Sequence, residues 1–255
     1  GLHALGAVAL LWGLNYRAKV SSVLSAIFAA SAVGLVGDPK LGVPARLAYY
    51  KLLMNVPIRG GTAATIIESL IWVLLMGIIV AIPGTMTQDY ATVLSIFALI
   101  VIVCVIVLII LGPEVVDRIW LVGTILRKIK PVRNFIFDVR TAILGIKAGW
   151  LFVAFVWLTL TYLVDVWSVW FLAKGVGSDL EPIDIGHAIV ISYLAGAASL
   201  IPLGLGVRDI AFAKLLENAG SSHEISALIV LYHRTLRTVV PLLLGFVISL
   251  YIARR

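Results

Sequence analysis

The stretch Ser199-Leu200-Ile201-Pro202-Leu203-Gly204-Leu205-Gly206-Val207-Arg208-Asp209 interrupts an apolar segment with one proline and two glycines. A similar break, Gly37-Asp38-Pro39-Lys40-Leu41-Gly42-Val43-Pro44, lies earlier, and Pro39 matches Pro202 at an offset of 163 residues. Prolines and glycines at this density make a continuous helix improbable. Paired breaks at corresponding positions in two halves of a membrane protein are the best sequence pointer to the binding site of a transporter.

The match extends beyond the prolines in the same ungapped frame. Ala32 aligns with Ala195, and the segment 48–55 aligns with 211–218, including a lysine and an asparagine in each copy. Alanine and leucine matches are expected in so apolar a chain, whereas the proline, lysine and asparagine matches are not. The alternative is a pair of unrelated helices that share a few residues.

The composition indicates a membrane protein. Hydrophobic residues make up 62% of the 255 residues, charged residues make up 13%, and the mean hydropathy is +1.10. The net charge of +7 is concentrated, because seven Lys/Arg lie between Arg118 and Lys147 and two more are Arg254 and Arg255. This is the positive-inside pattern of cytoplasmic loops, so we expect a cell-membrane location and no nucleic-acid partner.

Helical segments can be placed by hydropathy and by the breaks. We expect full or partial spans at 1–16, 21–37, 45–55, 62–82, 91–111, 150–173, 185–201, 207–218 and 224–253, and an interfacial amphipathic helix at 113–133. Arg59 is expected in a turn before the span 62–82, and Pro241 lies inside the last helix.

The charges of the loops suggest an orientation. If both broken segments are re-entrant hairpins, the first opens to the cytoplasm near Arg59 and the second opens outside near the acidic loop 174–184. Every basic loop and the C-terminus then lie in the cytoplasm.

The expected fold is all-α, a single polytopic transmembrane domain over 1–255, with inverted repeats at about 1–111 and 141–255 joined by a basic cytoplasmic segment, 112–140. Irregular backbone at membrane depth must line a wet cavity or be buried, so we expect a polar cavity where the hairpins meet.

The second break has the features of an anion receptor. Gly204 and Gly206 free the backbone to turn, and the half-helix that follows presents unpaired N–H groups and its positive dipole end. Arg208 adds a positive charge at the same place, which suits a phosphate-type headgroup. The alternative is a simple kink with a neutral Arg208–Asp209 pair.

The last helix carries Arg234 and Arg237, which share a face because they are three residues apart. Each is about ten or more residues from the helix start, roughly 15 Å deep. An arginine there costs a few kcal/mol or more, so a partner or an aqueous cavity is expected. The partner is either a bound anion or an acid, Glu68 or Asp209. Glu68 itself is an intramembrane counter-ion, a proton carrier or a shallow interfacial acid.

Other polar residues carry less information. Asp165 is expected near the outer headgroups, and of the four histidines, which lack metal-ligand spacing, only His233 beside Arg234 stands out. Neither a Ser/His/Asp set, a carboxylate pair nor a Walker-type glycine loop is apparent in the sequence. We therefore expect no enzymatic activity, no cofactor and no metal.

The chain resembles the lysylphosphatidylglycerol synthase transmembrane region, a flippase-like family, from about Ser21 to the C-terminus. The late motif of that family, an apolar-Pro-x-Gly-x-Gly stretch with an acid and then an arginine about 25 residues on, is met by Pro202, Gly204, Gly206, Asp209 and Arg234.

The early motif of the family, Pro-x-x-Gly-Glu-x-x-Arg, is met by Pro39, Gly42 and Arg46, with Val43 in place of the glutamate. A later Glu-Arg pair appears as Glu68-Ser69. These departures indicate a divergent member and leave the role of the early acid open.

The resemblance implies a lipid transporter, a flippase that moves a phospholipid or a polyprenyl-phosphate-linked headgroup across the membrane. The alternative is a membrane subunit that presents a lipid substrate to a glycosyl- or aminoacyl-transferase, either a partner or a fused domain. A homodimer is compatible with both. The synthetic activity of the synthases is not carried over, because the 255 residues hold no hydrophilic stretch long enough for their soluble domain.

Overall fold

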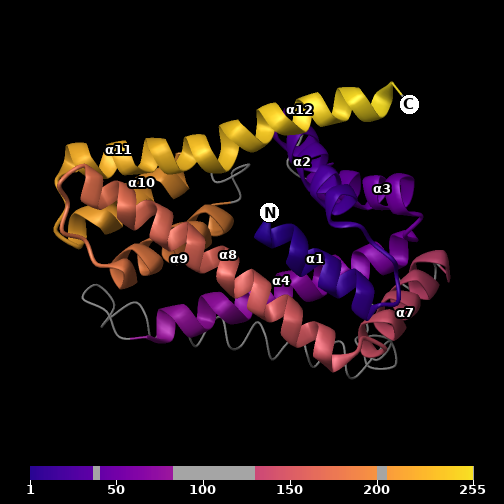
Figure 1. Cartoon of the computed structure of the whole chain (residues 1–255). Coiled ribbons are helices and arrows are strands. Elements are labelled where there is room, and N and C mark those ends of the chain that lie inside the picture. The colour runs from indigo at the N-terminus through magenta and orange to yellow at the C-terminus, as the bar shows by residue number, and fades with distance from the viewer. Residues whose placement is uncertain (37–40, 83–129, 200–205, 255) are drawn as a thin grey trace.

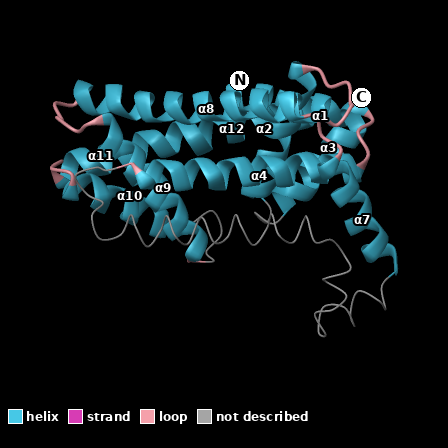
Figure 2. Ribbon diagram, turned by 90° about the horizontal axis from the view of Figure 1, so that it is seen from below, coloured by secondary structure: helices cyan, strands magenta, loops and turns pink. Residues whose placement is uncertain are grey.

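A computed structural model describes residues 1–36, 41–82, 130–199 and 206–254, and every regular element in these ranges is helical (Figures 1 and 2). The fold is therefore all-α, as expected. The predicted span 91–111 lies outside the described residues, and so does most of the predicted amphipathic helix 113–133. The last residues of that segment belong to α7, Lys130–Leu144.

The first half contains α1 (Leu2–Gly13), α2 (Val20–Val36), α3 (Gly42–Met54) and α4 (Ile58–Ala81). α3 begins before the expected Ala45 because Pro44 lies in its first turn, where a missing N–H leaves no hydrogen bond unmade. α4 begins directly after the extended residue Pro57, so Arg59 lies in its first turn and not in a loop.

The second half contains α8 (Ala148–Gly175), α9 (Pro182–Ala198), α10 (Val207–Asn218) and α11 (His223–Arg234), followed by a π-helical segment, η3 (Thr235–Val239), and α12 (Val240–Ala253). The last three form one long helix, close to the expected 224–253. Its π-helical turn lies just before Pro241, whose ring nitrogen cannot donate to the carbonyl of Arg237 in a regular α-helix. The proline thus explains why the hydrogen-bond pattern changes here.

Three described helices are long and apolar enough to cross a bilayer: Ile58–Ala81, Ala148–Gly175 and the continuous helix His223–Ile252. α1, α2 and α9 are apolar but shorter. This pattern is that of a multi-pass membrane protein.

The two halves meet where α1 packs against α8. Gly13 lies against Ile146 and Trp150, and Gly6 lies against Leu158, so the two helices run antiparallel. A Cβ atom on Gly13 would come within 2.8 Å of Trp150. Small residues therefore set the close approach of these helices, as in other membrane interfaces.

The long helix after each broken segment also packs against the helix that leads into the other break, α9 for the first half and α2 for the second. α4 contacts α9, where the ring Nε2 of His187 lies 2.9 Å from the carbonyl oxygen of Ile79. α12 contacts α2, where Gly245 sits so close that a Cβ atom would lie 2.0 Å from the carbonyl oxygen of Phe28. The halves are thus joined by reciprocal contacts.

The two ends of the molecule are formed by different segments. α7 packs beside the start of α4, where Arg59 lies 3.3 Å from Asp138, and the C-terminus lies at the same end (Figure 1). The opposite end carries the loop between α8 and α9, with Lys174 and Asp179 2.9 Å apart. α2 and α3 lie toward the first end, and α9 and α10 toward the second. Whether either pair re-enters a membrane leaflet stays a prediction.

Candidate functional site

A buried ion pair joins α3 to α4. Arg46 Nη2 donates to Glu68 Oε2 at 2.6 Å, Nη1 donates to Oε1 at 3.0 Å, and Nε donates to the hydroxyl of Tyr50 at 2.7 Å. His3 Nε2 lies 2.6 Å from the same carboxylate. Glu68 is only 6% exposed. Of the alternatives for Glu68, the structure therefore shows the counter-ion, and its partner is Arg46.

A second ion pair joins α10 to α11. Arg234 pairs with Asp209, one of the two acids that the sequence offered as its partner. The same Asp209 oxygen accepts a hydrogen bond from the backbone N–H of Gly206 at 3.2 Å. Both side chains are about a quarter exposed. The start of α10, expected to be an anion receptor, thus already carries a carboxylate of its own chain in this conformation.

A third ion pair joins η3 to α8. Arg237 Nε donates to Asp165 Oδ1 at 2.7 Å, Nη2 contacts Oδ2, and His233 Nε2 lies 3.4 Å from Oδ1. The Asp165 side chain is 7% exposed, so it is enclosed by protein, and its expected depth near the outer headgroups stays a prediction. The signal was an acid inside an apolar helix, which requires a partner wherever it lies in the helix.

Arg208 differs from the other three arginines of the site. Its guanidinium carbon lies 3.6 Å from the centre of the Tyr193 ring, a close cation–π contact. Within the described ranges no carboxylate forms an ion pair with Arg208. Gly206, the N-cap of α10, has φ +79°, a conformation that a residue with a side chain rarely adopts. Pro202 and Gly204 lie outside the described residues.

A cavity of about 370 Å³ opens between α2, α3 and the π-helical segment, and we call it the basic cavity. Of the described residues that line it, four are basic and none is acidic. They are His3, Arg46, Arg208 and Arg237, with Ile27, Ala30, Ser31, Gly34, Gly42, Val43, Thr238 and Pro241 around them. Arginines from both broken segments and from the last long helix therefore face one space.

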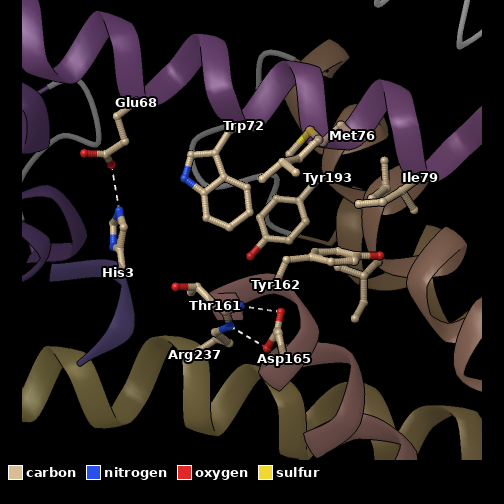
Figure 3. Close-up of a pocket in the computed structure, with 13 residues that line it drawn as sticks. His3, Glu68, Trp72, Met76, Ile79, Thr161, Tyr162, Asp165, Tyr193 and Arg237 are labelled. Atoms are coloured by element: carbon tan, nitrogen blue, oxygen red, sulfur yellow. Dashed lines mark hydrogen bonds and ion pairs between the residues drawn. The ribbon is translucent and has the colours of Figure 1, made fainter. Parts of the chain in front are cut away.

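A second cavity of about 280 Å³ adjoins the first, and we call it the aromatic cavity (Figure 3). His3 and Arg237 line both cavities. Its walls combine aromatic and aliphatic side chains with the two buried acids. They are Trp72, Leu75, Met76, Ile79, Thr161, Tyr162, Ile189, Val190 and Tyr193, with Glu68 and Asp165. Figure 3 shows both carboxylates engaged, Glu68 by His3 and Asp165 by Arg237.

Among the described residues, the charges of the site do not cancel. Glu68 neutralises Arg46, and Asp165 neutralises Arg237. Arg208 remains as a surplus positive charge at the basic cavity. Asp209 and Arg234 line a small neighbouring cavity of about 50 Å³ that also touches Arg208. Arg46, Glu68, Arg208, Asp209, Arg234 and Arg237, all expected as site residues, thus come together, and His3, Trp72, Asp165 and Tyr193 join them.

His3, Trp72 and Tyr193 were not foreseen, because nothing in a single sequence shows which face of an apolar helix meets a cavity. Their helical positions are compatible with lipid-facing or core packing as well. They line the same cavity because α1, α4 and α9 meet around it.

Comparison with known proteins identifies the relatives of the chain. A UPF0104 membrane protein of Methanocaldococcus jannaschii is 25% identical over 109 residues, which cover 42% of this chain and 32% of the relative, so the match spans about a third of that protein. No solved structure matches the chain. The family model described as the lysylphosphatidylglycerol synthase TM region matches residues 1–245. The chain with this charged double cavity therefore belongs to the lysylphosphatidylglycerol synthase transmembrane family.

Proposed function

We propose that the chain is a lipid transporter, a flippase, that binds the phosphate of a phospholipid or polyprenyl-phosphate-linked lipid in the basic cavity and passes it across the membrane. The observation that carries the proposal is Arg208, which faces this cavity without a carboxylate partner among the described residues. A fixed, unpaired charge at membrane depth is costly unless an anion visits it.

The surplus charge suits a headgroup with one negative charge. Arg46 and Arg237 add guanidinium donors on other walls of the cavity, and guanidinium groups match phosphate oxygens in geometry and charge. A volume of about 370 Å³ accommodates a headgroup but not a lipid chain. The hydrocarbon tail of the lipid would stay in the bilayer beside exposed apolar residues of the outer helix faces, such as Leu231 and Leu243.

The orientation of the protein in the membrane is proposed from the charges of its loops. The end of the molecule with α7 and the C-terminus would face the cytoplasm of the cell, and the α8–α9 loop would lie outside. Cysteines introduced at Asn134 and Asp179, in a Cys104→Ala background, should react with an impermeant reagent from opposite sides. Reaction of both from one side would contradict this orientation.

We further propose that the chain has no enzymatic activity of its own. Transport would be passive or coupled to an ion, and a transferase would act as a separate partner or fused domain. The alternative function, presentation of the lipid to such a transferase, shares the binding step but not the transfer across the bilayer.

Transport in proteoliposomes tests the proposal. An external quencher reaches only the outer leaflet of liposomes, about half of a fluorescent phosphatidylglycerol. Liposomes that contain the purified chain should lose more than half of their fluorescence, because transport brings inner-leaflet lipid to the quencher. With Arg208→Gln the loss should stay at about half. Arg59→Gln is the matched control, because Arg59 is an exposed arginine outside both cavities. Equal transport by the wild type and Arg208→Gln would refute the proposal. Binding of the lipid without any transport would favour the presenting subunit.

A further inference from the structure

The Arg237–Asp165 pair is the only described ion pair of the site whose arginine lines both cavities. Its partners differ in exposure: the Arg237 side chain is 35% exposed, whereas that of Asp165 is 7% exposed. A phosphate in the basic cavity would therefore compete with Asp165 for the same guanidinium. The carboxylate cannot follow, because its helix α8 packs against α1 and α9.

Arg237 also lies in the middle of η3, the π-helical segment. Single π turns inside α-helices recur at functional sites. Because Pro241 favours the π turn, the backbone of η3 can stay as it is while the side chain of Arg237 moves. This side chain is long and partly exposed, so it can turn from Asp165 toward a bound phosphate.

A carboxylate that shares or loses its cation in an apolar enclosure is a costly charge, and the usual outcome is that it takes a proton. The charged and titratable groups that face Asp165 come from every helix around it: Arg237 on η3, His233 on α11, Tyr162 on α8, Tyr193 on α9, and across the aromatic cavity His3 on α1 and Glu68 on α4. Arg46 and His3 are already bound to Glu68, so neither offers Asp165 a replacement positive charge. His233 is the remaining neighbour within reach.

We propose that binding of an anionic headgroup to Arg237 is accompanied by uptake of one proton from water onto the Asp165–His233 pair, so that the protein couples headgroup binding to a proton. The step forms one O–H or N–H bond and needs no other reactant. It rests on the proposed function only in assuming that a phosphate enters the basic cavity. Lipid transport would then be linked to protons and respond to a pH gradient.

Isothermal titration calorimetry of the purified chain in detergent tests this, with dihexanoyl phosphatidylglycerol as the ligand. The heat should depend on the ionisation enthalpy of the buffer and correspond to about one proton taken up per lipid at pH 7. The apparent affinity should fall by up to about tenfold per unit rise in pH. The phosphodiester does not titrate in this range, so the effect belongs to the protein.

Variants identify the group that takes the proton. Asp165→Asn should bind the lipid with no proton uptake, whereas Asp179→Asn, an acid-to-amide change in an exposed loop, should keep it. His223→Gln, a change at an exposed histidine outside both cavities, should also keep it. A parallel titration uses dimethyl phosphate, a diester that does not titrate in this range either. Uptake of the same proton with this ligand means that the phosphate group alone drives the step.

The outcomes separate the two proposals. Lipid binding with the same heat in every buffer, or proton uptake that persists in Asp165→Asn, would overturn the proton coupling and leave the proposed function intact. No binding of any anionic lipid by the wild type would overturn both. The buffer dependence of the wild type is decisive even if Asp165→Asn fails to fold.

Discussion

The two broken segments carry the same kind of ion pair with its charges exchanged. Arg46 and Asp209 are separated by 163 residues, the offset that relates Pro39 to Pro202. Arg46 pairs with Glu68 in the long helix that follows the first segment, and Asp209 pairs with Arg234 in the long helix that follows the second. Both segments therefore place an ion pair at this position, with the acid and the base exchanged.

The surroundings of the two pairs differ. The side chains of Arg46 and Glu68 are 12% and 8% exposed and are supported by Tyr50 and His3. Those of Arg234 and Asp209 are 25% and 28% exposed. We infer that the first pair mainly stabilises the fold, whereas the second can be exchanged at little cost.

Removal of one partner should show the largest difference. Glu68→Gln leaves a buried arginine without a carboxylate and should cost about 3–5 kcal/mol of unfolding free energy. The counterpart Arg234→Gln should cost about 1 kcal/mol, because water reaches both partners. Chemical unfolding in detergent measures both. A loss of several kcal/mol in Arg234→Gln that Asp209→Asn restores would make the second pair structural and erase the contrast.

Exchange of the first pair should sharpen the comparison. Arg46→Glu combined with Glu68→Arg gives the first half the charge order of the second, and the double variant should be about 2 kcal/mol more stable than the sum of the single changes predicts. Lipid transport should nevertheless fall, because the basic cavity then holds a carboxylate in place of an arginine. Recovery of transport along with stability would remove Arg46 from the binding site.

The glycine at the second break should show a smaller effect. Gly206 has φ +79°, whereas Val43, at the corresponding position of the first segment, lies in the first turn of α3. Gly206→Ala should cost about 1–2 kcal/mol because an L-residue is strained there. Gly149→Ala is the control, since Gly149 has ordinary backbone angles and open space around it. Equal unfolding free energies of the two variants would mean that an alanine is not strained at position 206.

Much of this architecture was predictable from local sequence. α10 has the expected bounds, and α2, α8 and α9 begin or end within a few residues of theirs, because long apolar runs bounded by Pro, Gly or charge leave few alternatives. The starts of α3 and α4 were placed too late, because Pro44 and Pro57 act within or just before a first turn and do not end a helix there.

The pairing of charges was predictable only in part. The Asp209–Arg234 pair was one of the stated alternatives, because an arginine deep in an apolar helix requires an acid or an anion as its partner. The partners of Glu68 and the burial of Asp165 were not, because they depend on how α1, α3, α8 and the last helix meet. Contacts between residues 65 or 72 positions apart leave no local pattern.

Native mass spectrometry of the chain released from its membrane tests the central claim, that Arg208 holds a phosphate-bearing lipid in the basic cavity. The wild type and Arg59→Gln should retain a lipid whose mass and fragmentation show a phosphate, and Arg208→Gln should retain several-fold less at equal folded fraction. Equal retention of that lipid by Arg208→Gln and Arg59→Gln would contradict the claim.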